Sequence, residues 1–226
     1  MEKLSGKHFP AAVLKEVNDN MAMEELQQVQ KLEKELAAQY AAAQADAKRR
    51  IAQRAAEMLG ETDSIIVASG STVYAFAEEI KMRMWHHLNI VTPFLRLGVL
   101  LNESENVNVV QLGGSVHKKS LSVLGEEAAR ELDDCICSKV FFGVDGIDPE
   151  HGITTSTIDE AKLTRRMMHA ASQVIVLADS SKFGRRGFSK ICDLEAVDRI
   201  ITDSGVQPLY LERLRERGIE VTVVDV

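Results

Sequence analysis

The sequence predicts an α/β protein whose mainly parallel sheet is covered by helices on both faces. Short apolar segments such as SIIVA (64–68) and QVIVLA (173–178) alternate with segments of helical periodicity. Strands that are apolar on both sides are typical of parallel sheets, because helices bury both faces of such sheets. Turn-forming residues follow these apolar segments, as expected where a strand ends and a crossover begins.

A long helix is predicted ahead of this pattern. From Met21 to Met58, apolar residues recur every three or four positions, and Gly60 ends the pattern. Residues 1–50 hold eight basic and eight acidic residues, so this segment is no basic arm. We therefore divide the chain into a tail and connector helix (1–46), which shows no recognisable helix-turn-helix, and a second domain (47–226).

The remaining elements are predicted in order along the chain. Strands are expected at 64–68, 89–92, 107–112, 139–144, 173–178, 199–202 and 220–225. Helices are expected after Thr72 as far as Lys81 and at 94–102, 126–132, 159–171 and 208–217. Pro93 ends the second strand, and Gly218 suits the left-handed position that follows the last helix.

Composition excludes several classes of protein. Of 226 residues, 45% are hydrophobic and 27% are charged, which is typical of a globular protein. The net charge of −7 argues against a chain that binds the phosphate backbone of nucleic acids along its length. We expect a cytoplasmic protein with reduced thiols, since the N-terminus lacks an apolar signal and no apolar run approaches a membrane span. Cys135, Cys137, Cys192 and the histidines lack metal-ligand spacing, so no metal or cofactor is expected.

Polar residues gather after the predicted strands, where parallel sheets bind ligands. The run from Ser69 to Thr72 precedes a helix, and can cradle an anion or simply cap that helix. Gly113 and Gly114 permit either close approach of a ligand or a ligand-free turn. Asp145 follows a buried strand directly and is well placed to accept hydrogen bonds from sugar hydroxyls.

Three further segments allow a functional and a structural interpretation. Thr154 and Thr155 can bind a phosphate or hydroxyl group, in a region that also shows ordinary turn chemistry. Glu160 and Lys162 begin a helix, where acidic residues are favoured by the helix dipole alone. Lys182 suits an anionic ligand or a solvated basic loop. Four such loops at strand ends are more informative together than any one of them.

In this order, these loops resemble the C-terminal sensor domain of the DeoR family of bacterial transcriptional regulators. The resemblance runs from about Ala47 to Val226. The segments that carry it are KRRIAQRAAEML (48–59), ASGST (68–72), QLGGSVHKKSLSVLG (111–125), KVFFGVDGIDPEHGITT (139–155), DEAKLTRRMM (159–168) and LADSSKFGRRGFSKI (177–191).

The resemblance implies a fold related to ribose-5-phosphate isomerase and the CoA transferases. It also implies a non-catalytic crevice for a phosphorylated sugar or related metabolite, whose binding alters operator binding by an N-terminal winged helix-turn-helix. A cytoplasmic repressor of sugar-metabolism genes that forms a homo-oligomer is expected. The matching ligand positions are Ser69, Gly70, Ser71, Thr72, Gly113, Gly114, Asp145, Thr154, Thr155, Glu160, Lys162 and Lys182.

The sequence departs from the family pattern at two places. Relatives commonly read Thr-Asn where this chain reads Thr92-Pro93, so an amide that could contact the ligand is missing. Residues 1–46 show neither a wing nor a His-Gly-Gly signature. We expect either a chain truncated after the DNA-binding module or a variant with a helical interaction segment, and favour truncation.

Two other functions stay open at this level. A sugar-phosphate isomerase could use Asp145, Asp148 and Glu160 as acid and base groups. Against it, residues 152–157 lack the lysine and glycine run that follows the acidic loop of the isomerases. A pure interaction protein would instead use residues 1–46 as a coiled-coil hook.

Overall fold

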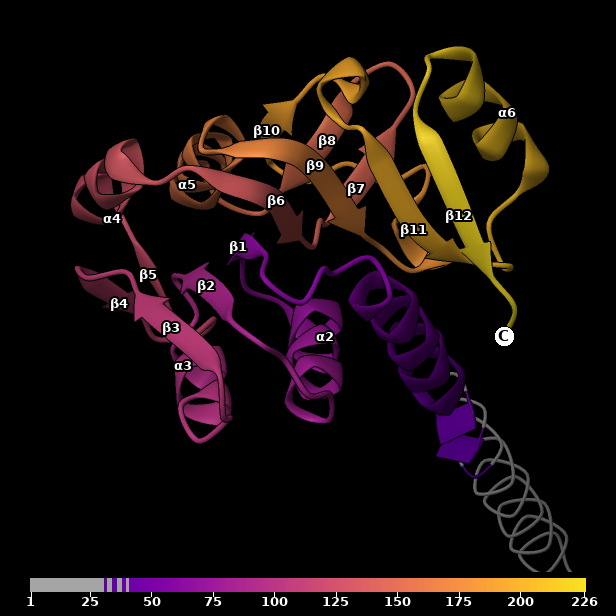
Figure 1. Ribbon diagram of the computed structural model, residues 1–226. Helices are drawn as coiled ribbons and strands as arrows, with labels where there is room; N and C mark the ends of the chain where they lie inside the picture. The colour runs from indigo at the N-terminus through magenta and orange to yellow at the C-terminus, as the bar shows by residue number, and fades with distance from the viewer. Residues whose placement is uncertain (1–30, 32–33, 36–37, 40) are drawn as a thin grey trace, which may run out of the picture. The chain divides into compact units, whose positions relative to one another are not determined.

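The computed structural model describes residues 31, 34, 35, 38, 39 and 41–226 (Figure 1). The chain forms two compact units, Met1–Ala43 and Gln44–Val226. The described residues of the first unit are helical, in agreement with the predicted long helix. The predicted tail and the first ten residues of that helix, 21–30, lie outside the described residues.

A seven-stranded parallel sheet forms the centre of the second unit. Its order is β12-β11-β9-β6-β1-β2-β3, and every neighbouring pair is parallel. The strands are β1 (Ser64–Val67), β2 (Leu88–Thr92), β3 (Val107–Gln111), β6 (Cys137–Phe142), β9 (Ala171–Leu177), β11 (Arg199–Asp203) and β12 (Glu220–Val224). The predicted strands are thus confirmed, with ends that differ by at most two residues.

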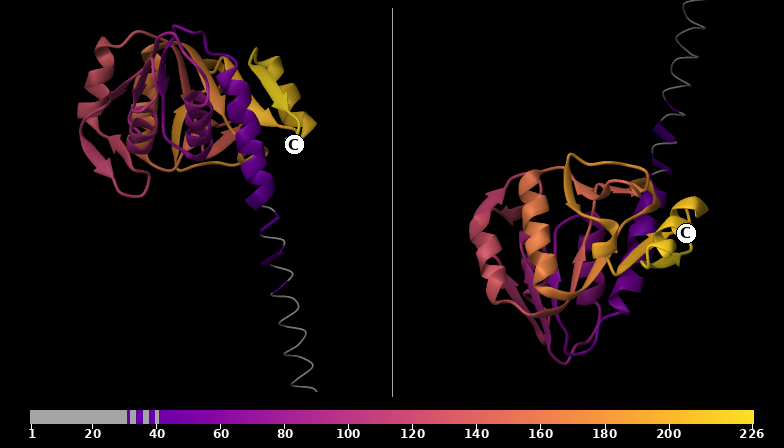
Figure 2. Two further views of the ribbon diagram at one scale, coloured as in Figure 1. Left: turned by 60° about the horizontal axis from the view of Figure 1, so that its bottom comes forward. Right: turned by 90° about the horizontal axis from the view of Figure 1, so that it is seen from above.

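Helices cover both faces of this sheet (Figures 1 and 2). The helical residues 44–56, α2 (Ser71–Lys81) and α3 (Leu95–Leu101) pack on one face. On the other lie α4 (Glu126–Glu131), α5 (Ile158–His169) and α6 (Pro208–Glu216). A hydrophobic core lies between the sheet and the helices on each face, and each inner strand contributes side chains to both cores. In β6, Val140 and Phe142 face one core and Phe141 faces the other. This double burial explains why the strands read as continuous apolar runs.

Two small antiparallel sheets complete the unit, and the sequence predicts neither. β4 (Ser115–His117) pairs with β5 (Ser122–Leu124), and β8 (Gly152–Thr155) lies between β7 (Gly146–Asp148) and β10 (Ser189–Cys192). The sequence pattern assigns no element to these segments. Strands of three or four residues, rich in turn-forming residue types, carry too little alternation to be recognised. Among the described residues, no helix is both long and apolar enough to span a bilayer.

Where the three-stranded sheet β10-β8-β7 meets the loop before β10, the backbone of one segment packs directly on the backbone of another. A Cβ at Gly146 would lie 2.2 Å from the carbonyl oxygen of Arg185, and one at Gly187 would lie 2.5 Å from that of Thr155. Thr154 joins the same segments, because its Oγ1 accepts from the N–H of Gly187 at 2.8 Å and donates to the Gly146 carbonyl at 3.2 Å.

Gly146→Ala should therefore lower the free energy of unfolding by roughly 1–3 kcal/mol, because neither backbone segment can move freely. Urea denaturation measures the change. Gly143→Ala is the matched control, since a Cβ there meets no atom closer than 3.8 Å. Equal loss of stability in both variants would contradict this account of the packing.

Candidate functional site

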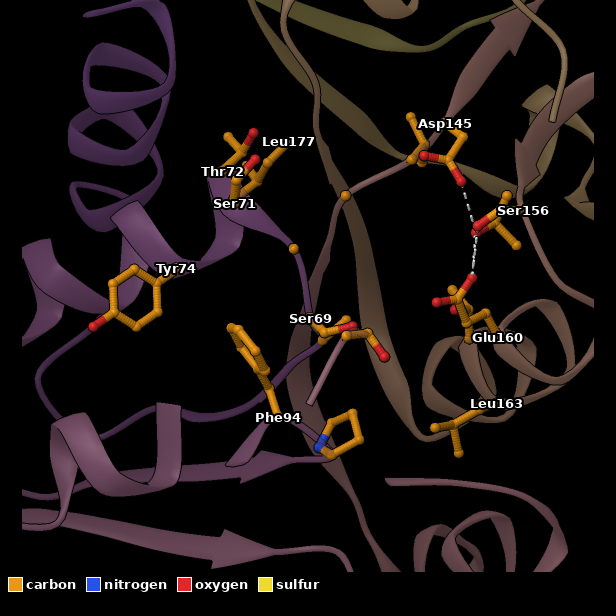
Figure 3. A pocket seen from close by; sticks show the side chains of 18 of the residues that line it. Ser69, Ser71, Thr72, Tyr74, Phe94, Asp145, Ser156, Glu160, Leu163 and Leu177 are labelled. Carbon is orange, nitrogen blue, oxygen red and sulfur yellow. Dashed lines mark hydrogen bonds between the residues drawn. The ribbon is translucent and has the colours of Figure 1, made fainter. Parts of the chain in front are cut away.

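A cavity of about 450 Å³ opens at the carboxyl edge of the large sheet (Figure 3). The segments that follow β1, β2 and β6 form its walls, together with the turn between β4 and β5, the end of β8, and α5. This is the edge at which parallel α/β sheets bind ligands, because the strand exits meet there.

The first wall is the start of α2. Gly70 is the N-cap residue, with a φ of +133° that favours glycine, and no side chain caps the helix. The first-turn N–H groups of a helix have no partner within the helix and carry its positive dipole end. Ser69, Ser71 and Thr72 add hydroxyl groups beside them. An anion therefore has both donors and a favourable field at this wall.

Opposite this wall, Figure 3 shows two carboxylates linked by one hydroxyl group. Thr155 Oγ1 lies 3.0 Å from Glu160 Oε2 and 3.3 Å from Asp145 Oδ2. Since a hydroxyl group has one proton, it cannot donate fully to both carboxylates. Ser156 donates a further hydrogen bond to Glu160 at 3.2 Å. The remaining acceptor capacity suits hydroxyl groups of a ligand.

Glu160 reaches this position because of the cap of α5. Thr157 is the N-cap, and its Oγ1 accepts from the backbone N–H of Glu160 at 3.2 Å. In a capping box the glutamate side chain would return to the N-cap N–H. Here the carboxylate instead meets Thr155 and Ser156 at the cavity. The interpretation of Glu160 as a residue that serves the helix dipole alone is therefore incomplete.

Three cationic side chains also line the cavity. Lys182 lies in the short helix η2 (Ser180–Lys182), Lys119 in the β4–β5 turn and Arg96 in α3. The Arg96 guanidinium stacks over the ring of Tyr74, with its central carbon 4.3 Å from the ring centroid. Cations and carboxylates thus share one cavity, which fits a ligand that carries both an anionic group and hydroxyl groups.

Eight of the twelve expected ligand residues line this cavity. They are Ser69, Gly70, Ser71, Thr72, Asp145, Thr155, Glu160 and Lys182. Their role in binding stays a prediction, but the loops that carry them do converge.

The other four expected residues lie elsewhere. Gly113 donates its N–H to the Glu131 carboxylate at 3.1–3.2 Å, and Gly114 takes a φ of +126° in the turn before β4. Thr154 is buried, and its hydroxyl is used between β7 and Gly187. Lys162 lines a separate cavity between α4 and α5. The structure does not bring these four to the cavity that the other eight line, and their role in binding stays a prediction.

The sequence interpretation missed several lining residues. Lys119 and Ser120 lie within the segment HKKS (117–120), whose lysines and serine are the residue types that bind anions, so this segment could have been predicted as part of the site. Tyr74, Phe94 and Leu121 gave none, because an apolar side chain at the wall of a cavity looks like a core residue in sequence.

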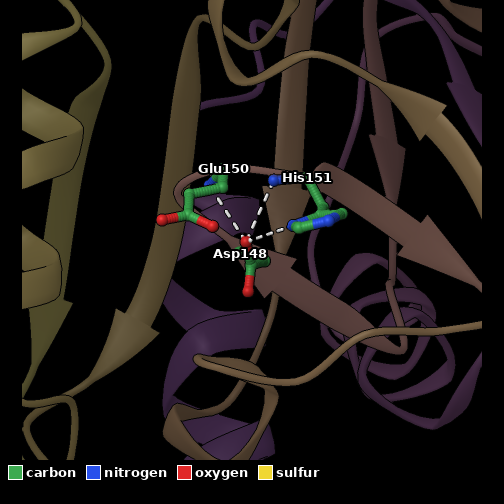
Figure 4. A group of neighbouring side chains, drawn as sticks. All are labelled: Asp148, Glu150 and His151. Carbon is green, nitrogen blue, oxygen red and sulfur yellow. Dashed lines mark hydrogen bonds and ion pairs between the residues drawn. The ribbon is translucent and has the colours of Figure 1, made fainter.

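Asp148 lies outside the cavity and holds the β7–β8 turn (Figure 4). Its Oδ1 accepts from the backbone N–H groups of Glu150 and His151, each at 2.9 Å. Its Oδ2 accepts from Arg186 Nε at 2.8 Å. The suggestion that Asp148 serves as an acid or base beside Asp145 is therefore wrong, because its carboxylate is occupied by the turn.

The same turn brings Asp148, Glu150 and His151 within metal-ligating distance of one another. The Arg186 guanidinium occupies one oxygen of the central carboxylate and places a positive charge there. A cation would have to displace that guanidinium and the N–H groups of the turn. The geometry fits a turn fixed by hydrogen bonds.

The three cysteines are free thiols. Burial raises the pKa of the Cys137 thiol to about 11 and that of Cys192 to about 12. Such thiols stay protonated at neutral pH and are poor nucleophiles. None of the three is paired in a disulfide, and the expectation of reduced thiols stays a prediction.

Comparisons with known proteins agree on one family. The model of the DeoR C-terminal sensor domain matches residues 43–204. A protein described as a repressor of the aga operon in Escherichia coli O157:H7 is 37% identical over 78% of this chain and 65% of its own length. The transcriptional repressor GlcR of Bacillus subtilis is 30% identical, over 79% of this chain and 67% of its own.

A lactose phosphotransferase system repressor of Streptococcus mutans is 33% identical, over 71% of this chain and 63% of its own. This chain thus spans about two thirds of the length of these relatives.

Solved structures are similar at the level of the fold. A translation initiation factor eIF-2B from Pyrococcus horikoshii covers 73% of this chain and 65% of its own, with a TM-score of 0.51 and 18% identity. Ribose 5-phosphate isomerase A from Neisseria gonorrhoeae covers 63% and 55%, with a TM-score of 0.46 and 19% identity.

Asp148 should make part of the stability of the fold depend on pH. Burial alone would raise its pKa, but Arg186 and the hydrogen bonds of the turn hold it well below its usual range. Its ionised form thus stabilises the fold above the unfolded pKa of about 3.9, and this contribution is lost as pH falls toward the folded pKa.

Asp148→Asn should lower the free energy of unfolding at pH 7 by roughly 1–3 kcal/mol, because it removes a charge-assisted hydrogen bond. The difference from wild type should shrink below about pH 4. Chemical denaturation at several pH values measures it, with the exposed Asp225→Asn as control. A difference that stays constant with pH would exclude this role for the carboxylate.

Proposed function

This chain belongs to the DeoR family of transcriptional regulators, and on that premise we propose that its cavity binds a phosphorylated sugar or a related small metabolite. The proposal includes that the occupied cavity alters DNA binding by a helix-turn-helix module, in a cytoplasmic repressor of sugar-metabolism genes. One observation carries it: an uncapped helix start faces a pair of carboxylates across one cavity at the carboxyl edge of the sheet.

The phosphate group is assigned to the start of α2. Gly70 lets a ligand approach the backbone, since it has no side chain and no atom lies within 4 Å of its Cβ position. Ser69 and Ser71 supply hydroxyl donors beside α2, which follows β1. Lys182 supplies positive charge from the segment after β9, and β1 and β9 lie on either side of β6. This combination of helix dipole, hydroxyl groups and lysine is typical of phosphate sites.

The sugar hydroxyl groups are assigned to Asp145 and Glu160. Carboxylates accept hydrogen bonds and do not donate them when ionised, so they select hydroxyl groups and reject a second phosphate by repulsion. The start of α2 and the two carboxylates together therefore favour a monophosphorylated polyol or sugar over a nucleotide with several phosphates.

A sensor fits the cavity better than an isomerase. The Thr155 hydroxyl links the two carboxylates, and their remaining acceptor capacity suits hydrogen bonds from ligand hydroxyl groups. Asp148, the third acid considered, is bound to Arg186. The relatives are described as transcriptional regulators, which supports a non-catalytic role.

Transmission is assigned to the contact between α2 and the helical residues 44–56. Ile51, Ala52 and Ala55 of that helix are fully buried in the core that also contains Val73 and Phe76 of α2. A ligand that fixes the start of α2 in one arrangement shifts the population of both helices. The predicted homo-oligomer belongs to the same proposal. Ile51 and Ala55 of the apolar stripe are used in this core, so the stripe positions ahead of them in the sequence, such as Leu26 and Val29, would meet a second copy.

Binding is tested by a thermal-shift screen of sugar phosphates. A ligand at a hundred times its dissociation constant should stabilise the fold by about 2.7 kcal/mol, or roughly 5–10 °C. Lys182→Ala should weaken binding about 10- to 100-fold, because it removes a charge-assisted hydrogen bond to the phosphate. Lys162→Ala is the matched control, since Lys162 lines a different cavity.

Ser71→Ala should lower the affinity for the same ligand about tenfold, because it removes one hydroxyl donor to the phosphate. If no sugar phosphate stabilises the protein, or if Lys162→Ala weakens binding as much as Lys182→Ala, the assignment of this cavity is wrong.

The enzyme alternative is tested directly with ribose 5-phosphate. We expect no aldose–ketose interconversion above the uncatalysed rate, measured by the absorbance of the ketose product. Clear turnover that disappears in Glu160→Gln would replace the sensor by an isomerase.

A further inference from the structure

The exit of β2 presents only carbon to the cavity. Pro93 has no N–H group, and its carbonyl oxygen accepts from the N–H of Val123 at 2.8 Å. The N–H of Phe94 donates to Thr92 Oγ1 at 3.1 Å, and its carbonyl oxygen accepts from the first turn of α3, where Leu97 N lies at 3.0 Å. Pro93 and Phe94 therefore offer a ligand no free backbone N–H group, in contrast to the exit of β1.

A leucine extends this apolar wall at a cost in backbone energy. Leu121, in the β4–β5 turn, has a φ of +51°; the residue is 41% exposed and lines the cavity. Its backbone is held on both sides, because its N–H donates to the His117 carbonyl at 2.9 Å and its carbonyl accepts from Leu95 at 3.0 Å. Asparagine or glycine would adopt this left-handed conformation with less strain.

Two buried residues of α5 line the same cavity. Leu163 is 3% exposed and Met167 2% exposed. Leu124 of β5 also lines the cavity and packs against the same core. Figure 3 shows Phe94 and Leu163 on the side of the cavity away from Ser71 and Thr72. These apolar side chains, Phe94, Leu121, Leu124, Leu163 and Met167, form what we name the apolar end of the cavity. Arg96, Lys119 and Ser120, from the same segments as Phe94 and Leu121, also line the cavity.

We propose that this apolar end is a subsite for a non-polar substituent of the effector, and that Leu121 determines specificity for it. The inference rests on the proposed function, since it assumes a sugar phosphate held at α2 and at the carboxylates. The ligand class is a phosphorylated sugar that carries an acyl methyl group or a deoxy carbon where an unsubstituted sugar has a polar group.

The strain at Leu121 supports a ligand contact over simple packing. A strained backbone conformation persists where the surrounding structure enforces it, often at ligand-binding positions. A leucine in that conformation that is two fifths exposed gains less from the protein core than a buried leucine does. It would gain more by covering an apolar group of a bound molecule.

Matched ligand pairs test the subsite. We would compare glucosamine 6-phosphate with N-acetylglucosamine 6-phosphate, glucose 6-phosphate with 2-deoxyglucose 6-phosphate, and ribose 5-phosphate with 2-deoxyribose 5-phosphate, by calorimetric titration of the full chain. In at least one pair the less polar member should bind about tenfold more tightly, as is usual for one buried carbon group.

Leu121→Asn should bring that ratio close to one, and Leu121→Met should keep it. Because asparagine tolerates the left-handed conformation, Leu121→Asn should unfold at a temperature no lower than wild type, so that lost selectivity is not lost folding. Leu121→Gly, which also tolerates the left-handed conformation, should likewise bring the affinity ratio close to one.

The outcomes separate the two proposals. If sugar phosphates bind but the less polar member never binds more tightly, the subsite is wrong and the proposed function stands. A ratio that Leu121→Asn and Leu121→Gly leave unchanged also overturns the role of Leu121. If no sugar phosphate binds at all, the proposed function fails and the subsite fails with it.

Discussion

The burial of a parallel sheet on both faces is the constraint on which the rest of this structure depends. The second half of a strand such as β6 is apolar on both sides, as Val140, Phe141 and Phe142 are, whereas Ser138 and Lys139 near its start contact Asp63. Each strand must also be followed by a crossover, which sends every exit to the same edge. The polar residues that follow these apolar halves therefore meet at that edge. A ligand cavity at that edge is a consequence of the topology.

The sequence was sufficient for the large sheet and for the helices, because their periodicities extend over enough residues to be distinct. It was sufficient for most of the cavity for a similar reason, since residues directly after buried strands must lie at the carboxyl edge. It failed where position along the chain does not determine direction in space. Lys162 lies two residues after Glu160 on α5 and therefore points to a different side of the helix, toward another cavity.

Partners distant in sequence caused the other errors. Nothing near Gly113 indicates that Glu131 takes its N–H, and nothing near Thr154 indicates that Gly187 donates to it. Conversely, Phe94 and Leu121 become cavity residues only because the β4–β5 turn folds back onto the exit of β2. Contacts of this kind follow from the completed fold, and local patterns do not contain them.

The glycines in and beside the three-stranded sheet limit which positions of the sequence can change. At Gly146, Gly152 and Gly187, any side chain would meet the backbone of a neighbouring segment within 2.5 Å. A chain that builds this scaffold must keep glycine there whatever molecule it detects. The glycine-containing segments by which this sequence resembles the DeoR sensor domain therefore reflect the scaffold and carry no information about a ligand. Phe94 and Leu121 line the cavity away from these glycines, so a different side chain at either position would reshape the cavity without meeting the backbone contacts that hold the scaffold.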